Sequence, residues 1–229
     1  MNKQVFWSLT DKTKFDLKTS FLSKAEQAVY DGFRFDLRRN SFLAGRWVAK
    51  GLIQQAVSLD CSYGEISILN ESSGKPYALV EGELLESVIS ISHAGKWAAA
   101  ALSVDGLRVG MDVEVVTPRQ GSFVADYFTS REFEILEDQS ENYDRNVTLI
   151  WSVKEATLKA LGLGLRLDTR KVWVDSLDLP QERNSVGWNR LSLGAIEGVW
   201  DGYWRQIEEA VLVCVADSQI GSEVELVRV

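Results

Sequence analysis

The chain has 229 residues, of which 45% are hydrophobic and 25% are charged, and its formal net charge is −8 at pH 7. This length allows one sizeable core or two of about 100 residues each, and the composition is typical of soluble globular proteins. The acidic charge argues against a nucleic-acid-binding protein, which normally carries a basic stripe.

The sequence contains no apolar leader, and no stretch approaches about 18 uninterrupted apolar residues. We therefore expect a cytoplasmic protein that does not bind membranes. Cys61 and Cys214 match no zinc or redox spacing, so we expect two free thiols in a reducing compartment.

The first part of the chain predicts a strand followed by two helices. The strand covers about residues 5–9, and Ser23 with Glu26 forms a capping-box signature that opens a helix to about Phe33. Apolar periodicity predicts a longer second helix over residues 38–57. Basic residues gather on and before this second helix: Arg34, Arg38, Arg39, Arg46 and Lys50. The alternative for each of them is a surface side chain whose stem covers apolar neighbours.

The segment NESSGKPY, residues 70–77, predicts a polar turn. Lys75 could meet a phosphate there as a point charge, although such a sequence is most often only a turn. Residues 88–92 alternate as a strand, and an apolar run follows over residues 97–104. His93, the only histidine, lies just after the strand, where a side chain can face a ligand; a lone histidine is more often structural.

Residues 109–116, read as a strand, place Asp112 and Glu114 on one face. Their spacing of about 6.6 Å along the backbone implies a repulsion of roughly 2.5 kcal/mol at an effective dielectric constant of about 20. A nearby cation would relieve that repulsion, and carboxylate oxygens are the ligands that Mg²⁺ prefers. The alternative is an edge strand that carries two solvated acids.

A second capping signature, Thr129 with Glu132, precedes a short amphipathic helix, and a polar break over residues 138–145 leads into a long one. Gly162 is placed to end the long helix in a left-handed cap.

Trp151, Glu155 and Lys159 share one face of this long helix because they are four residues apart. A docked Glu155 would add a third carboxylate to Asp112 and Glu114. The alternative is an exposed Glu155–Lys159 pair, which would stabilise the helix by about 0.2–0.5 kcal/mol and do no chemistry.

The remaining sequence predicts antiparallel strands of the second half, over residues 171–177, 199–205, 210–215 and 223–229. We expect a polar loop of unknown role over residues 180–194. The order of strand, capped helix, long helix and strands occurs twice. We therefore predict an α+β protein with two similar halves, residues 1–105 and 106–229, and a site in the cleft between them.

Four motifs in this order resemble the 4'-phosphopantetheinyl transferase superfamily, in particular the surfactin-synthetase type, in which one chain carries both halves. They are Gly74-Lys75-Pro76, Ser92-His93, Gly110-Met111-Asp112-Val113-Glu114, and Trp151-Ser152-Val153-Lys154-Glu155 with Lys159. The motifs extend over most of the chain, and the last two are the most diagnostic of the family.

The resemblance implies an enzyme that transfers 4'-phosphopantetheine from coenzyme A to a serine of an apo acyl or peptidyl carrier protein. The expected protein is a monomer that needs Mg²⁺ and releases adenosine 3',5'-bisphosphate. The implied metal ligands are Asp112, Glu114 and Glu155, and the implied catalytic residues are Glu155 and Lys159. The implied coenzyme A contacts are Arg46, Lys75, Ser92, His93 and Lys159.

Carrier proteins of this kind are acidic, so an acidic enzyme would attract them only through local basic patches. The candidates are Arg34, Arg38, Arg39, Arg46 and Lys50 in the first half and Arg166, Arg170 and Lys171 in the second. Two other functions stay open: a non-catalytic coenzyme A or nucleotide-binding module, and a metal-dependent phosphate ester hydrolase. The full acidic set favours catalysis over simple binding. Four pathways stay open for the carrier: fatty acid, polyketide, polyunsaturated fatty acid and nonribosomal peptide synthesis.

Overall fold

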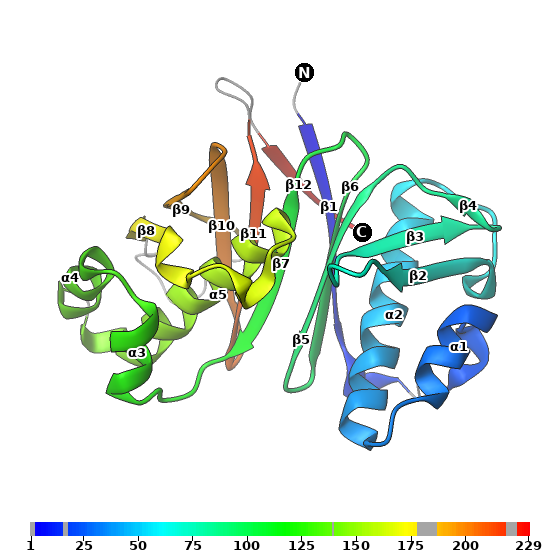
Figure 1. The fold of residues 1–229 in the computed structure, drawn as a ribbon, viewed down its shortest axis with the longest axis horizontal. Coiled ribbons are helices and arrows are strands. Elements are labelled where there is room, and N and C mark those ends of the chain that lie inside the picture. The colour runs from blue at the N-terminus through cyan, green and yellow to red at the C-terminus, as the bar shows by residue number, and fades with distance from the viewer. Residues whose placement is uncertain (1–2, 16–17, 139, 178–186, 219–223) are drawn as a thin grey trace.

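The helices and strands that the sequence predicts occur in the expected order, within a mixed α+β fold. The computed structural model describes residues 3–15, 18–138, 140–177, 187–218 and 224–229. Figure 1 shows two halves side by side, each with a sheet toward the middle of the molecule and helices toward the outside. No helix in the described part of the chain has the length and apolar character needed to cross a membrane.

The first half builds one sheet and a small separate one. Its elements are β1 (Lys3–Asp11), α1 (Lys24–Asp31), α2 (Asp36–Ala56), β2 (Ile66–Asn70), β3 (Pro76–Val80), β4 (Glu83–Leu84), β5 (Val88–Ala94) and β6 (Trp97–Ser103). Strands β2, β3 and β4 form the small sheet. The buried face of α2, with Ala44, Val48 and Leu52, packs against β1, β5 and β6.

The second half builds a sheet in the order β7-β11-β10-β9-β8, against which α5 packs. Its elements are β7 (Val109–Val115), α3 (Gly121–Tyr127), α4 (Ser130–Asp138), α5 (Tyr143–Leu161), β8 (Val172–Leu177), β9 (Asn189–Ala195), β10 (Trp200–Ile207), β11 (Ala210–Asp217) and β12 (Val224–Arg228). Short 3-10 helices span residues 12–14, 19–21, 63–65, 140–142, 164–166 and 169–171.

Two expectations about the end of the chain are wrong. The predicted loop over residues 180–194 contains the start of β9, where Leu191 and Leu193 alternate into the core; residues 178–186 lie outside the description. Strand β12 does not join the second sheet. It pairs in parallel with β1, because Val224 and Leu226 pack into the apolar layer between the two large sheets. A boundary near residue 105 stays a prediction.

A buried ion pair links the elements of the first half. Glu26 accepts from the backbone N–H of Ser23 at 2.9 Å, which completes the predicted capping box of α1. The same carboxylate pairs with the Lys50 ammonium of α2 and accepts from the N–H of Ile68 in β2 at 3.0 Å. Lys50 is fully buried, so it cannot serve as a basic surface group.

The second half repeats this arrangement. Glu132 accepts from the N–H of Thr129 at 2.7 Å, pairs with Lys154 of α5 at 2.9 Å, and accepts from the N–H of Val174 in β8 at 3.0 Å. In both halves the strand N–H comes 42 residues after the glutamate. The two halves are therefore repeats of one α+β unit.

Replacing Lys50 by methionine should lower the free energy of unfolding by about 3–5 kcal/mol, because the buried Glu26 carboxylate would lose the cation that pairs with it most closely. The matched control is Arg131→Met, since Arg131 forms an exposed pair with Glu134 whose loss should cost less than about 1 kcal/mol. Urea unfolding followed by circular dichroism measures both. Equal losses in the two variants would contradict a structural role for the buried pair.

Candidate active site

Three carboxylates meet where α5 packs against β7. Asp112 and Glu114 lie on the same face of β7, and Glu155 comes from α5. One oxygen of each carboxylate lies within 4.8 Å of the others, which is close enough for a single cation to bind all three. The structure therefore brings together the acidic residues that the sequence singles out.

Gly110 allows this approach. A Cβ atom at position 110 would lie only 1.8 Å from the carbonyl oxygen of Ala156 in α5. Any larger residue would push α5 away from β7 and separate Glu155 from Asp112. The glycine of the sequence motif is thus required by the packing of the helix.

Asp112 is 1% exposed and accepts hydrogen bonds from three side chains. Ser92 of β5 donates to Oδ1 at 2.8 Å, Ser152 of α5 donates to Oδ2 at 2.6 Å, and the Lys159 ammonium lies 2.6 Å from Oδ1. Lys159 also donates to the Ser92 hydroxyl at 2.9 Å. The alternatives of a solvated Asp112 and of an exposed Glu155–Lys159 pair are therefore wrong, because Lys159 binds Asp112.

The crowding of negative charge changes the protonation of two carboxyl groups. Burial, followed by the charges of Asp112 and Glu155, raises the pKa of Glu114 to about 7. Burial and Asp112 also raise the pKa of Glu155. Arg119, whose guanidinium lies 3.4 Å from Glu114, opposes both shifts. A proton on Glu114 substitutes for the positive charge that this cluster lacks.

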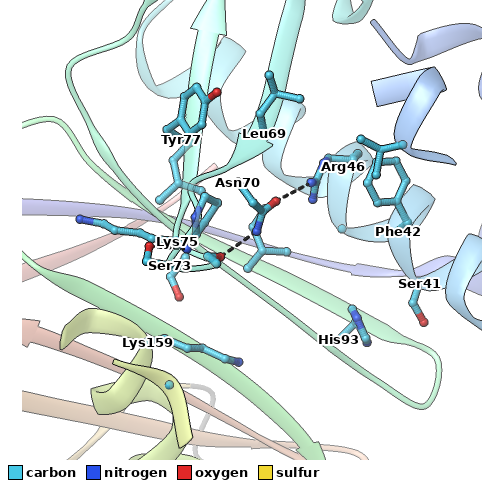
Figure 2. A pocket seen from close by; sticks show the side chains of 18 of the residues that line it. Ser41, Phe42, Arg46, Leu69, Asn70, Ser73, Lys75, Tyr77, His93 and Lys159 are labelled. Carbon is cyan, nitrogen blue, oxygen red and sulfur yellow. Dashed lines mark hydrogen bonds between the residues drawn. The ribbon is translucent and has the colours of Figure 1, made fainter. Parts of the chain in front are cut away.

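A cavity of about 850 Å³ opens beside the acid cluster, on the side of the first half. Residues from α1, α2, the β2–β3 turn, β5 and the end of α5 line it, and Lys159 belongs both to its wall and to the Asp112 network. Figure 2 shows the Lys159 chain extending toward the side of the cavity where His93 lies, whereas the Lys75 chain extends the other way.

Arg46 supplies a positive charge from α2 to the cavity wall. Its guanidinium donates to Asn70 at 3.1 Å, lies 3.6 Å from Glu26 and stacks over the Phe42 ring. The buried Nε atom has no hydrogen-bond partner among the described residues. Arg46 is therefore held in place by Asn70, Glu26 and Phe42.

Three other residues that the sequence assigns to ligand binding differ in their accessibility. Lys75 and His93 line the cavity, but Ser92 is buried and engaged with Asp112 and Lys159. The side chain of His93 is exposed at the cavity surface. The surrounding protein, and then Lys159, lower its pKa below the ordinary 6.5. A neutral imidazole is thus favoured near pH 7.

Sequence reasoning missed two members of the site. Ser152 stands seven residues before Lys159, so a helical projection puts both on the face of α5 that meets Asp112. Because Ser152 lies inside the Trp151–Glu155 motif, the sequence could have identified it as a site residue. Arg119 lies in the connection after β7, and nothing in the local sequence links it to Glu114.

Two sequence families match the chain. One, described as the 4'-phosphopantetheinyl transferase superfamily, matches residues 108–209, and the other, described as 4'-phosphopantetheinyl transferase, N-terminal, matches residues 6–104. The 4'-phosphopantetheinyl transferase psf-1 of Bacillus pumilus is 27% identical over 146 residues, which cover 63% of this chain and 60% of that protein. A holo-[acyl-carrier-protein] synthase of Streptococcus agalactiae is 31% identical over 87 residues, which cover 37% of this chain and 73% of that protein.

Among solved structures, the chain is similar to a holo-(acyl-carrier-protein) synthase from Bacillus anthracis in complex with coenzyme A (3',5'-ADP). The similarity has a TM-score of 0.38 and 25% sequence identity, and it covers 43% of this chain and 91% of that chain.

In the presence of a metal chelator, the free energy of unfolding should fall as the pH rises from about 4.5 to about 7. Glu114 holds a proton more tightly in the folded state than in the unfolded state over that window, so deprotonation favours unfolding. The loss should be on the order of 3 kcal/mol, the equivalent of raising the pKa of Glu114 from 4.5 to about 7. Glu114→Gln should flatten this part of the profile, and Glu134→Gln, at an exposed position, should not. Thermal unfolding between pH 4 and pH 9 tests this, and parallel profiles for wild type and Glu114→Gln would disprove it.

Proposed function

The chain belongs to the 4'-phosphopantetheinyl transferase superfamily, and we propose that it transfers the 4'-phosphopantetheine group of coenzyme A to a serine of an apo carrier protein. The main support is the junction of the acid cluster and the cavity. Asp112, Glu114 and Glu155 converge within 4.8 Å, and Lys159 connects them to the cavity wall. A site that only bound a nucleotide would not need this full set of three acidic residues.

We propose that the cavity holds coenzyme A. Its volume of about 850 Å³ suits a ligand of this size, and its walls combine apolar side chains with cationic groups at several points. Arg46 and Lys159 offer positive charge, and His93 offers a neutral ring nitrogen that can donate to a phosphate oxygen. Lys75 lines the cavity beside Gly162, at the end of α5. Ser92 acts indirectly, by positioning Lys159.

The acid cluster fits a divalent metal ion with a preference for oxygen ligands. Asp112, Glu114 and Glu155 would hold Mg²⁺, and the raised pKa values of Glu114 and Glu155 indicate that positive charge is favourable there. When bound, the ion supplies charge neutralisation for the pyrophosphate. Ser152 and Lys159 keep the Asp112 carboxylate in a fixed orientation.

In the proposed reaction the acceptor serine oxygen attacks the β-phosphorus of coenzyme A while the carboxylate of Glu155 takes the hydroxyl proton. A bond forms between the serine oxygen and phosphorus, and the bond from phosphorus to the bridging oxygen breaks. Adenosine 3',5'-bisphosphate leaves with that electron pair. Glu155 acts as the general base, and Lys159 and His93 stabilise charge on the phosphate oxygens.

Intact-protein mass spectrometry tests the function directly. Several apo carrier proteins are incubated with this chain, coenzyme A and Mg²⁺, and a mass gain of one phosphopantetheinyl group is expected on at least one of them. Release of free phosphopantetheine without a mass gain would indicate a hydrolase. No reaction together with tight coenzyme A binding would indicate a binding module. A cytoplasmic location and a monomeric state stay predictions.

Glu155→Gln should lower turnover by at least about 10²-fold, because it keeps the size of the side chain but cannot accept the proton. Glu134→Gln, on the exposed face of α4, should leave turnover unchanged. Steady-state kinetics at saturating Mg²⁺ measures both variants. A near-normal rate for Glu155→Gln would rule out its role as the base.

Lys159→Met should raise the KM for coenzyme A by about tenfold or more, with a smaller effect on kcat, because a phosphate-binding group acts mainly on the bound substrate. The same change should reduce stability in a chelator by at least about 1 kcal/mol, since the buried Asp112 loses its cation. Mg²⁺ should restore part of that stability. Lys171→Met, at an exposed position, is the control, and an unchanged KM in Lys159→Met would contradict this assignment.

A further inference from the structure

The corner between α1 and α2, residues 33–39, carries exposed apolar side chains. No other part of the described chain covers them. Phe35 is 75% exposed and Leu37 is 77% exposed, the highest values among the large apolar side chains of the described residues. Single exposed apolar residues are ordinary on protein surfaces, but two such neighbours on one corner are a small apolar patch.

Leu37 continues the buried face of α2 beyond the edge of the core. It lies seven residues before Ala44 and eleven before Val48, so the three share one helical face. Ala44 and Val48 are buried against the sheet, whereas Leu37 projects past it. The apolar face of the helix is therefore longer than the surface that covers it.

The corner is also basic in an acidic chain. Residues 33–39 contain Arg34, Arg38 and Arg39 against one acid, Asp36, while the whole chain has a net charge of −8. Arg39 lies 3.8 Å from Asp36. Arg34 and Arg38 are exposed and form no ion pair within the described residues.

The other basic patch that the sequence suggests is less available. Arg166 donates to the carbonyl groups of Gly162 and Leu163 at the end of α5, and Arg170 forms an ion pair with Asp168. The corner is thus the better candidate for binding an acidic surface.

The corner lies next to the cavity. Phe33 and Arg38 line the cavity wall, so a partner seated on Phe35 and Leu37 would lie at its mouth. Figure 1 shows the N-terminal end of α2 at the same end of the molecule as the β5–β6 turn and α3.

We propose that this corner docks the carrier protein that presents the acceptor serine, by contact with an apolar face bordered by carboxylates. The inference rests on the proposed function, because it identifies the partner with the acceptor. Arg34 and Arg38 would attract the carboxylates over a distance and set the orientation, and Phe35 with Leu37 would form the dry centre of the contact.

The double variant Phe35→Ser/Leu37→Ser should raise the KM for the apo carrier by at least about tenfold. Turnover at saturating carrier and the KM for coenzyme A should stay within twofold of wild type, since neither residue lines the cavity. Leu84→Ser is the matched control, because Leu84 is an exposed leucine on β4, away from the corner. Arg34→Glu should raise the same KM and reduce its dependence on salt.

Calorimetry with the apo carrier in the absence of coenzyme A separates docking from chemistry. Equal dissociation constants for wild type and the double variant, or no carrier binding by wild type, would overturn the docking inference. Intact docking without any transfer would count against the proposed function instead. Sedimentation analysis adds a further outcome: a wild-type dimer that the double variant converts to monomer would make the corner a self-association surface and overturn the inference.

Discussion

Asp112 is a carboxylate that is buried at the point where β5, β7 and α5 meet. The geometry of the site depends on the hydrogen bonds and the cation that compensate this buried charge. A buried carboxylate is tolerated only when hydrogen bonds and a cation compensate for lost hydration. Ser92, Ser152 and Lys159 provide that compensation, one from the first half and two from the second. The same contacts fix the tip of Lys159 beside the cavity. A stability requirement of the fold thus places a cationic group where a phosphate can meet it.

The two halves share an internal framework and differ in what they add to it. Glu26 with Lys50 and Glu132 with Lys154 tie a capped helix, a long helix and a strand together in the same way. Around this framework the first half provides most of the cavity wall, and the second provides the acid cluster. Neither half holds the whole site, so the site depends on how the two halves pack against each other.

Much of this arrangement follows from local sequence patterns, because strand alternation and helix spacing decide which side chains share a face. The common face of Asp112 and Glu114 and the left-handed cap at Gly162, with φ of 70°, are of this kind. Partner choice across elements is not local. Helix spacing puts Lys159 one turn from Glu155, but its ammonium group pairs with Asp112. Sequence alone suggests that Lys50 is a basic surface residue, but it is buried and pairs with Glu26. Strand β12 likewise crosses to β1 because of packing that no short window reveals.

The charge balance of the cluster limits what the cleft can bind. Three carboxylates face two cations, Lys159 and Arg119, so the fully ionised cluster carries one negative charge, which would repel a pyrophosphate. Burial, followed by the charges of Asp112 and Glu155, raises the pKa of Glu114 to about 7, and a proton on Glu114 also relieves this imbalance. His93 cannot supply that charge, because its lowered pKa leaves the ring neutral once Glu114 ionises. A divalent cation would leave the cluster with one positive charge instead. The cation and an anionic donor should therefore favour each other's binding, since each makes the cluster's charge more suitable for the other.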